Sequence, residues 1–130
     1  MLDHIGFSVS DLARSRAFYE KALAPLGIVK IMELTAEQTG GNGHVGFGEN
    51  GKPYFWIGDR ADSALRGCLH VAFVANDRAA VDAFYRAALA AGGRDNGVPG
   101  LRPHYHAGYY GAFVVDPDGH NVEAVCHKPE

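Results

Sequence analysis

The apolar and polar positions of the chain follow one pattern twice. The first copy begins at His4 and the second at His70, and in each the following residues alternate between bulky apolar side chains and small or polar ones. Alternation with a period of two predicts a β-strand and places the histidine on the face opposite the bulky side chains. We therefore expect the bulky face of each strand to pack against a helix and the histidine face to look into open space.

Each predicted strand leads directly into a predicted helix. Asp11 and Asp77 are residues of the type that caps the first turn of a helix. Apolar side chains then recur at the spacing of an amphipathic helix. Gly27 and Gly93 end the two segments, as glycine commonly does after the last helical turn. The pattern therefore predicts a strand followed by a helix in both halves.

Three further strands fit behind each helix, where turn-forming residues separate short apolar stretches. The signal is weak only for the first of them in the second half. We therefore expect an α+β fold of two repeated βαβββ modules in a single domain over 1–130. The first module covers about 1–60 and the second about 67–127. The further strands are expected near residues 28–34, 44–48 and 54–58, and near 94–98, 109–116 and 120–126.

The two halves also match residue by residue. Residues 4–27 align with residues 70–93 without a gap. The shared residues include the leading histidine, a phenylalanine, the aspartate at the start of the helix and an Ala-Phe-Tyr triplet inside it. Agreement of this extent indicates the duplication of one structural unit. Each copy then supplies one histidine from an equivalent strand.

Composition narrows the range of functions. The chain has 130 residues, a formal net charge of -3 and no basic block, which argues against nucleic-acid binding. No apolar stretch reaches membrane-spanning length and no secretory leader is visible, so we expect a cytoplasmic protein without membrane contact. The 7 histidines are more than a core requires and point toward metal or acid–base chemistry.

The duplicated unit and the ending DPDGHNVEAV at 116–125 resemble the vicinal oxygen chelate superfamily over essentially the whole chain. This superfamily includes glyoxalase I, extradiol dioxygenases, fosfomycin-resistance proteins and bleomycin-resistance proteins. The resemblance implies that the two modules pair their sheets into a half-open, barrel-like arrangement around a central cavity with a metal ion. It also implies a homodimer and a small-molecule substrate.

Three residues match the metal-ligand positions of this superfamily, namely His4, His70 and Glu123. Alternation along the last strand independently places Glu123 on the same side as Asn121 and opposite Val122. Two imidazoles and one carboxylate form a facial triad that suits Fe(II) or Mn(II) and leaves positions open for substrate and water. We therefore expect one divalent metal ion, whether Fe, Mn, Ni or Zn. The alternative is that the histidines are hydrogen-bonded cavity residues and that the glutamate pairs with an arginine.

One departure from glyoxalase I is visible. That enzyme carries a fourth ligand, a carboxylate on the last strand of the first module, where this chain reads KPYFWIGD at 52–59. Phe55 aligns with Glu123 when the preceding turns are superposed, and Trp56 does so after a shift of one residue. Neither side chain can bind a hard metal, so the activity of glyoxalase I itself is in doubt. Both are candidates for an aromatic substrate pocket, with plain core as the alternative.

The segment RPHYHAGYYGAF at 102–113 is the second candidate for chemistry. His106 and Tyr110 are candidate catalytic residues, because a histidine and a tyrosine beside the metal of extradiol dioxygenases handle protons and hold substrate oxygens. His104 is the substitute for His106. The alternative is a surface loop with aromatic packing. Arg66 and Arg102 are candidates for binding an anionic substrate, with a solvated surface charge as the alternative for each.

The expected function is that of a metal-dependent enzyme acting on a small molecule that chelates the metal through adjacent oxygens. The reaction stays open between lyase or isomerase chemistry, dioxygenation and group transfer. One alternative is a non-catalytic dimer that binds a small molecule or drug, as bleomycin-resistance proteins do. Another is a thiol transferase of the fosfomycin-resistance type. The intact His4, His70 and Glu123 favour an enzyme, because a sequestering protein has no need of them.

Overall fold

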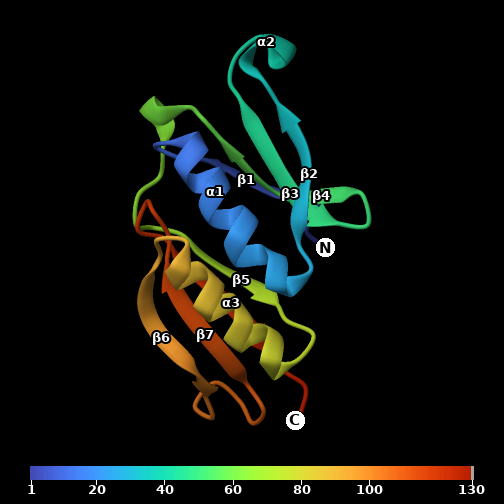
Figure 1. Cartoon of the computed structure of the whole chain (residues 1–130), viewed down its shortest axis with the longest axis vertical. Helices are drawn as coiled ribbons and strands as arrows, with labels where there is room; N and C mark the ends of the chain where they lie inside the picture. The colour runs from blue at the N-terminus through green and yellow to red at the C-terminus, as the bar shows by residue number, and fades with distance from the viewer. Residues whose placement is uncertain (130) are drawn as a thin grey trace.

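The computed structural model describes residues 1–129, and the strands and long helices of both halves follow the same order (Figure 1). The first half consists of β1 (Ile5–Ser8), α1 (Leu12–Leu23), the 3-10 helix η1 (Ala24–Leu26), β2 (Val29–Leu34), α2 (Ala36–Thr39), β3 (His44–Glu49) and β4 (Lys52–Gly58). The second half consists of the 3-10 helix η2 (Ala61–Ser63), β5 (His70–Val74), α3 (Arg78–Ala90), β6 (Arg94–Leu101), β7 (Tyr110–Val115) and β8 (Asn121–Cys126).

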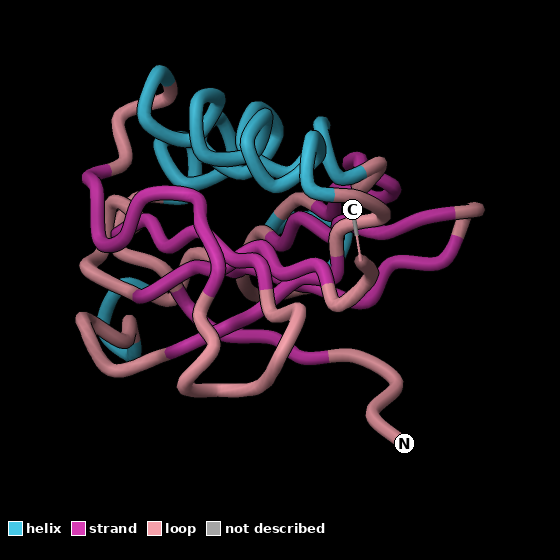
Figure 2. The backbone as a smooth tube through the Cα atoms, turned by 90° about the horizontal axis from the view of Figure 1, so that it is seen from below, coloured by secondary structure: helices cyan, strands magenta, loops and turns pink. Residues whose placement is uncertain are grey.

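Each half forms a four-stranded sheet with an equivalent strand order. The order is β1-β4-β3-β2 in the first sheet and β5-β8-β7-β6 in the second. The first strand of each half runs parallel to the last strand of that half. α1 and α3 lie side by side on one side of the two sheets (Figure 2). The predicted two-module α+β fold is confirmed, although the two sheets of one chain do not close into a barrel.

The predicted helix caps are present in both modules. The Asp11 side chain accepts a hydrogen bond from the backbone N–H of Arg14, and the Asp77 side chain accepts one from Ala80. Each bond satisfies an N–H group of the first turn that has no partner within the helix. Behind η1, Gly27 adopts a φ of 79°, a left-handed conformation that favours glycine.

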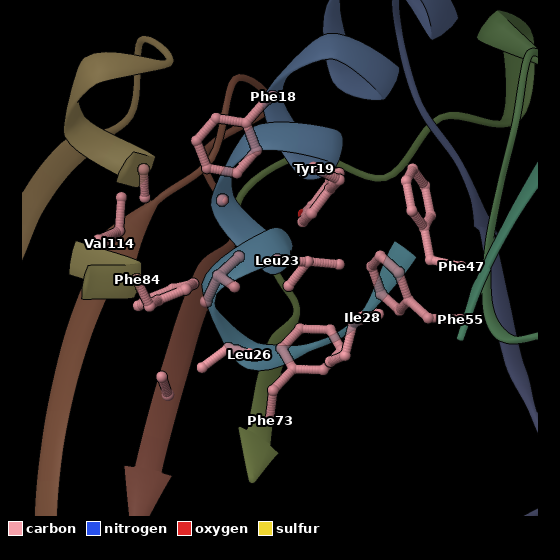
Figure 3. Close-up of a cluster of buried hydrophobic side chains, with 14 of the residues drawn as sticks. Phe18, Tyr19, Leu23, Leu26, Ile28, Phe47, Phe55, Phe73, Phe84 and Val114 are labelled. Carbon is pink, nitrogen blue, oxygen red and sulfur yellow. The ribbon is translucent and has the colours of Figure 1, made fainter. Parts of the chain in front are cut away.

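One hydrophobic core beneath the two helices joins the modules. The ring centroid of Phe55 on β4 lies 5.0 Å from that of Tyr19 on α1 and 5.1 Å from that of Phe73 on β5 (Figure 3). Edge-on ring contacts stabilise a core beyond the area that they bury. Phe55 is 1% exposed. Its ring therefore belongs to the core shared by the two modules and not to the side of the sheet that carries the histidines.

A buried hydrogen bond also joins the two modules. The hydroxyl of Tyr19 donates to the carboxylate of Asp116 in the turn between β7 and β8 at 2.5 Å. The backbone N–H groups of Asp118 and His120 donate to the other oxygen of this carboxylate. Burial first, and then the neighbouring Asp116 carboxylate, raise the pKa of Tyr19 well above its ordinary value. The DPDG turn thus fixes the second sheet to the helix of the first module.

β6 is longer than the sequence pattern indicates. Predicted within 94–98, it continues to Leu101 through Gly97, Pro99 and Gly100. Glycine and proline weaken a strand signal, but β6 is an edge strand whose pairing with β7 contains register shifts. Edge strands tolerate such residues because one side of the backbone needs no partner strand.

Candidate functional site

The side of each sheet that α1 and α3 leave uncovered, here named the open face, carries the candidate site. In the second sheet Glu123 on β8 pairs in register with Ala72 on β5 and with Phe113 on β7. Val122 and Ala124 belong to the core on the helix side. Because side chains alternate along a strand, Glu123 lies on the open face, as the pattern of the last strand predicts.

Glu123 is a buried carboxylate with two hydrogen-bonding partners. Its side chain is 1% exposed, and Oε1 lies 2.8 Å from Nε2 of His70, whose side chain is 55% exposed. Oε2 accepts a hydrogen bond from the hydroxyl of Tyr109. Removing a carboxylate from water costs on the order of several kcal/mol unless its charge is compensated. Among the described residues, His70 is the ion-pair partner of this carboxylate.

Tyr109 is a functional candidate that the sequence pattern did not single out. Burial first, and then the hydrogen bond to Glu123, raise the pKa of Tyr109 well above its ordinary value, so its phenol keeps its proton at neutral pH. Gly111 makes room for this contact, because a Cβ there would lie 3.2 Å from the Tyr109 ring and 3.3 Å from the Glu123 carboxylate. Alternation along β7, counted from the residue opposite Glu123, is the sequence signal that points to Tyr109.

Tyr110 lies on the opposite side of β7. Its hydroxyl donates to Asp82 on α3 at 2.7 Å. Ala112 and Val114, on the same side of the strand, belong to the core. One step along a strand turns a side chain to the other face. The structure therefore does not bring Tyr110 to the candidate site, and Tyr109 is the tyrosine that contacts the buried carboxylate.

His104 and His106 lie on the loop between β6 and β7 and are exposed. The Nε2 atom of His106 lies 2.9 Å from Nδ1 of His127. The His106 ring packs edge-on against Tyr109 with centroids 5.2 Å apart, whereas the ring of His104 contacts Tyr105. His106 therefore contacts Tyr109, the residue whose hydroxyl bonds Glu123. Of the two histidines, His106 is the better candidate for a role at the site.

His4 does not join His70 and Glu123 within one chain. It precedes β1 of the first sheet, and its Nδ1 atom lies 2.6 Å from Oδ1 of Asp3, which also accepts a hydrogen bond from Lys52. Within residues 1–129, no group of three His, Cys, Asp or Glu side chains lies close enough to hold a metal ion. The two modules of one chain therefore bring together only two of the three predicted ligands.

Trp56 occupies the position in the first module that Glu123 occupies in the second. β1 pairs Gly6 with Trp56, just as β5 pairs Ala72 with Glu123. Gly6 and Ala72 are equivalent in the sequence repeat, so the structure selects the second of the two alignments that the sequence allowed. The indole lies over Gly46, where a Cβ would come within 2.9 Å of its ring. An aromatic side chain thus stands in the first module at the position that holds a carboxylate in the second.

The open face of the first sheet carries a hollow of about 570 Å³. His4 and Trp56 line this hollow together with His44 and Lys52. The first sheet thus presents an imidazole beside an indole, while the second sheet presents an imidazole beside a carboxylate. Trp56 stays a candidate for contact with a substrate, and Phe55 does not.

The donor atoms of the second sheet fit a divalent metal ion. An imidazole nitrogen and a carboxylate oxygen 2.8 Å apart are ligand types common to Fe, Mn, Ni and Zn sites. A buried carboxylate also needs a cation to compensate its charge. The phenol of Tyr109 on Oε2 is the kind of outer partner that orients a ligating carboxylate. His70 and Glu123 would supply two ligands, and a third would have to come from elsewhere.

The fold and these residues define a protein of two tandem βαβββ modules with an imidazole and a buried carboxylate on one open sheet face. The chain belongs to the Glyoxalase/Bleomycin resistance protein/Dioxygenase superfamily, whose family model matches residues 1–124. The family resemblance noted in the sequence is thereby confirmed. No curated protein matches the sequence significantly.

Several solved structures are similar to this chain. A glyoxalase/bleomycin resistance protein from Albidiferax ferrireducens T118 is 27% identical with a TM-score of 0.77, and 99% of each chain is covered. An E144Q mutant of glyoxalase I from Zea mays is 25% identical with a TM-score of 0.71, covering 95% of this chain and 46% of the maize chain. The fosfomycin resistance protein FosX from Listeria monocytogenes shares the fold at 21% identity and a TM-score of 0.66, covering 100% of this chain and 93% of FosX. Among residues 1–129, no helix has the length and apolar character needed to cross a membrane.

Proposed function

We propose that the protein is a metal-dependent enzyme that acts on a small molecule offering two adjacent oxygens to the metal. His70 and Glu123 would hold the metal from the second module, and His4 of a second copy of the chain would complete the ligand set. One observation carries the proposal. A carboxylate that is 1% exposed lies 2.8 Å from an imidazole that is open to solvent, which is a favourable place for a cation.

A second copy is part of the proposal because the two open faces of one chain carry complementary parts. One sheet has His4, and the other has His70 and Glu123. If the first sheet of one copy stacks on the second sheet of another, a twofold dimer forms two complete sites at once. The maize glyoxalase I comparison supports this arrangement. The match covers 46% of that chain, so a chain of that length has room for two copies of this one.

When bound, the metal would supply a Lewis acid that holds two substrate oxygens and stabilises negative charge developing on them. Tyr109 fixes the Glu123 carboxylate and, because its pKa is raised, keeps a proton beside the site. His106 is exposed and in ring contact with Tyr109, so it is placed to exchange protons with solvent. Trp56 stands where glyoxalase I has its fourth ligand, which favours a reaction other than that of glyoxalase I.

Metal content tests the proposal. Protein purified without a polyhistidine tag or chelators should hold about one transition-metal ion per chain, and Glu123→Ala should lose it. His4→Ala and His70→Ala should lower the metal content similarly, because each removes one donor. His127→Ala keeps all three donors and should retain the metal. A wild-type protein that stays metal-free after reconstitution with Fe, Mn, Ni and Zn would favour a non-catalytic binding dimer instead.

A further inference from the structure

Arg102 stands at the end of β6, directly opposite Tyr109. Its backbone N–H donates to the carbonyl oxygen of Tyr109 at 2.7 Å, continuing the antiparallel ladder in which Leu101 pairs with Tyr110. Residues opposite each other in such a ladder share a face. Arg102 therefore lies on the open face of the second sheet, beside the tyrosine that bonds Glu123.

The guanidinium of Arg102 is held in one place. Its Cζ atom lies 5.4 Å from the centroid of the Phe113 ring, and Nη2 donates to the carbonyl oxygen of Val98 at 2.6 Å. Gly97 and Gly100 leave the space that it occupies, because Cβ atoms there would lie 3.3 Å from Nη2 and 3.1 Å from Nη1. The cation–π contact and the hydrogen bond restrain a side chain that is otherwise flexible.

The ring of Phe113 connects the arginine with the candidate metal site. Phe113 pairs with Glu123 in register, and its centroid lies 6.3 Å from that of the His70 imidazole. Arg102 and His70 thus approach the same aromatic ring. A small molecule that reaches His70 and Glu123 has the guanidinium as a neighbour on the same face.

This guanidinium has no acidic partner within the part of the chain that the structure describes. None of the ion pairs formed by residues 1–129 includes Arg102. The carbonyl oxygens of Val98 and Leu101 accept hydrogen bonds from it, and a guanidinium carries five N–H donors. The guanidinium is fixed and half-buried, and it has N–H donors beyond those that bond the two carbonyl oxygens. Proteins recognise carboxylates and phosphates with such guanidinium groups.

We propose that Arg102 binds an anionic group of the substrate, either a carboxylate or a phosphate-type oxyanion, while the adjacent oxygens of the same molecule face His70 and Glu123. This inference rests on the proposed function and narrows its substrate class to anionic chelating molecules. It also gives a reason for Gly97 and Gly100, which make room for the guanidinium.

The test uses two probes that differ at one group, which is a carboxylate in one and its neutral amide in the other. Protocatechuate and its amide share the aromatic ring and the two adjacent oxygens, but only the acid carries a carboxylate. Each is titrated by calorimetry, under nitrogen, into the Mn(II)-loaded and the metal-free protein. Wild type should bind the acid about tenfold more tightly than the amide, as expected for one charge-assisted bidentate contact.

Three variants make the test specific to Arg102. Arg102→Gln should bind both probes equally, and Arg102→Lys, which keeps the charge without the planar fork, should keep part of the preference. Arg86→Gln is the matched control, because it removes the same charge from α3 on the far side of the sheet. It should keep the full preference. Unfolding curves of the two Arg102 variants check that each protein is folded before its binding is compared.

The outcomes separate this inference from the proposed function. Loss of the preference in Arg102→Gln alone supports it. Equal binding of both probes by metal-loaded wild type, or an unchanged preference in Arg102→Gln, overturns the inference about Arg102. Neither result contradicts the proposed metal site. If no metal loads, the proposed function fails. An Arg102-dependent preference in the metal-free protein then still supports the anion site, and equal binding or none overturns it.

Discussion

His70 Nε2 and Glu123 Oε1 lie 2.8 Å apart although 53 residues separate them in sequence. The contact arises because β5 and β8 run parallel in a register that sets Ala72 beside Glu123. The imidazole at the start of β5 then reaches the carboxylate on the neighbouring strand. A buried carboxylate that meets an open imidazole is the feature from which the proposed chemistry of this chain follows.

Two variants that each impair metal binding should complement each other if a second copy supplies His4. His4→Ala and Glu123→Ala each remove a ligand from both sites of a homodimer. In a mixed dimer one site carries both changes and the other carries none. The mixed dimer, isolated with two different affinity tags, should therefore bind about half the metal of the wild type. Elemental analysis checks this, and a metal-free mixed dimer would mean that His4 and Glu123 of different copies share no site.

Tyr109→Phe should weaken metal binding while leaving the ligands themselves in place. The change removes the hydroxyl that holds Oε2 of Glu123. Loss of such an outer partner typically weakens metal affinity by about 10–100-fold. Competition with a chelating dye measures the affinity. Tyr110→Phe is the matched control, because it removes the bond to Asp82 on the other side of β7. Equal losses in both variants would point to general loosening of the strand.

Trp56→Glu should add a carboxylate to the open face of the first sheet, at the position that Glu123 occupies in the second. Trp56 pairs with Gly6 as Glu123 pairs with Ala72, so the new side chain would start from the equivalent position on the open face. A further oxygen ligand should raise the metal affinity on the order of tenfold. Trp56→Gln removes the same indole without adding a charge. Equal affinities of the two variants in a chelator competition would contradict the assignment.

Much of the fold and half of the candidate site depend on local patterns that a single sequence displays. Alternation along the strands decides which face His70 and Glu123 occupy. Asp11 and Asp77 mark the helix starts through bonds to backbone groups three residues on. Such features involve only a few neighbouring residues, so they can be predicted without knowledge of the tertiary structure.

The rest of the fold and of the candidate site depends on how segments that are distant in the sequence pair with each other. Tyr110 is the tyrosine predicted from the sequence, and the register of β7 against Glu123 places Tyr109 on the open face instead. The placement of His4 relative to His70 depends on the way the modules sit side by side. That arrangement is fixed by contacts such as the bond between Tyr19 and Asp116, across 97 residues of sequence. No local pattern carries this information.

The hydrogen bond from Tyr19 to Asp116 predicts how the stability of the fold changes at high pH. Burial and the neighbouring carboxylate raise the pKa of Tyr19 above 10.0, so the folded state keeps a proton that the unfolded chain loses. Above about pH 10 the folded state then binds more protons than the unfolded chain, so the free energy of unfolding falls as the pH rises. Below that pH, Tyr19 is protonated in both states and causes no change of stability with pH. Tyr19→Phe should cost about 1–3 kcal/mol at neutral pH, because Asp116 loses a buried donor, and should flatten this decline. Urea unfolding at a series of pH values measures both effects, and equal slopes in the two proteins would show that Tyr19 does not cause the decline.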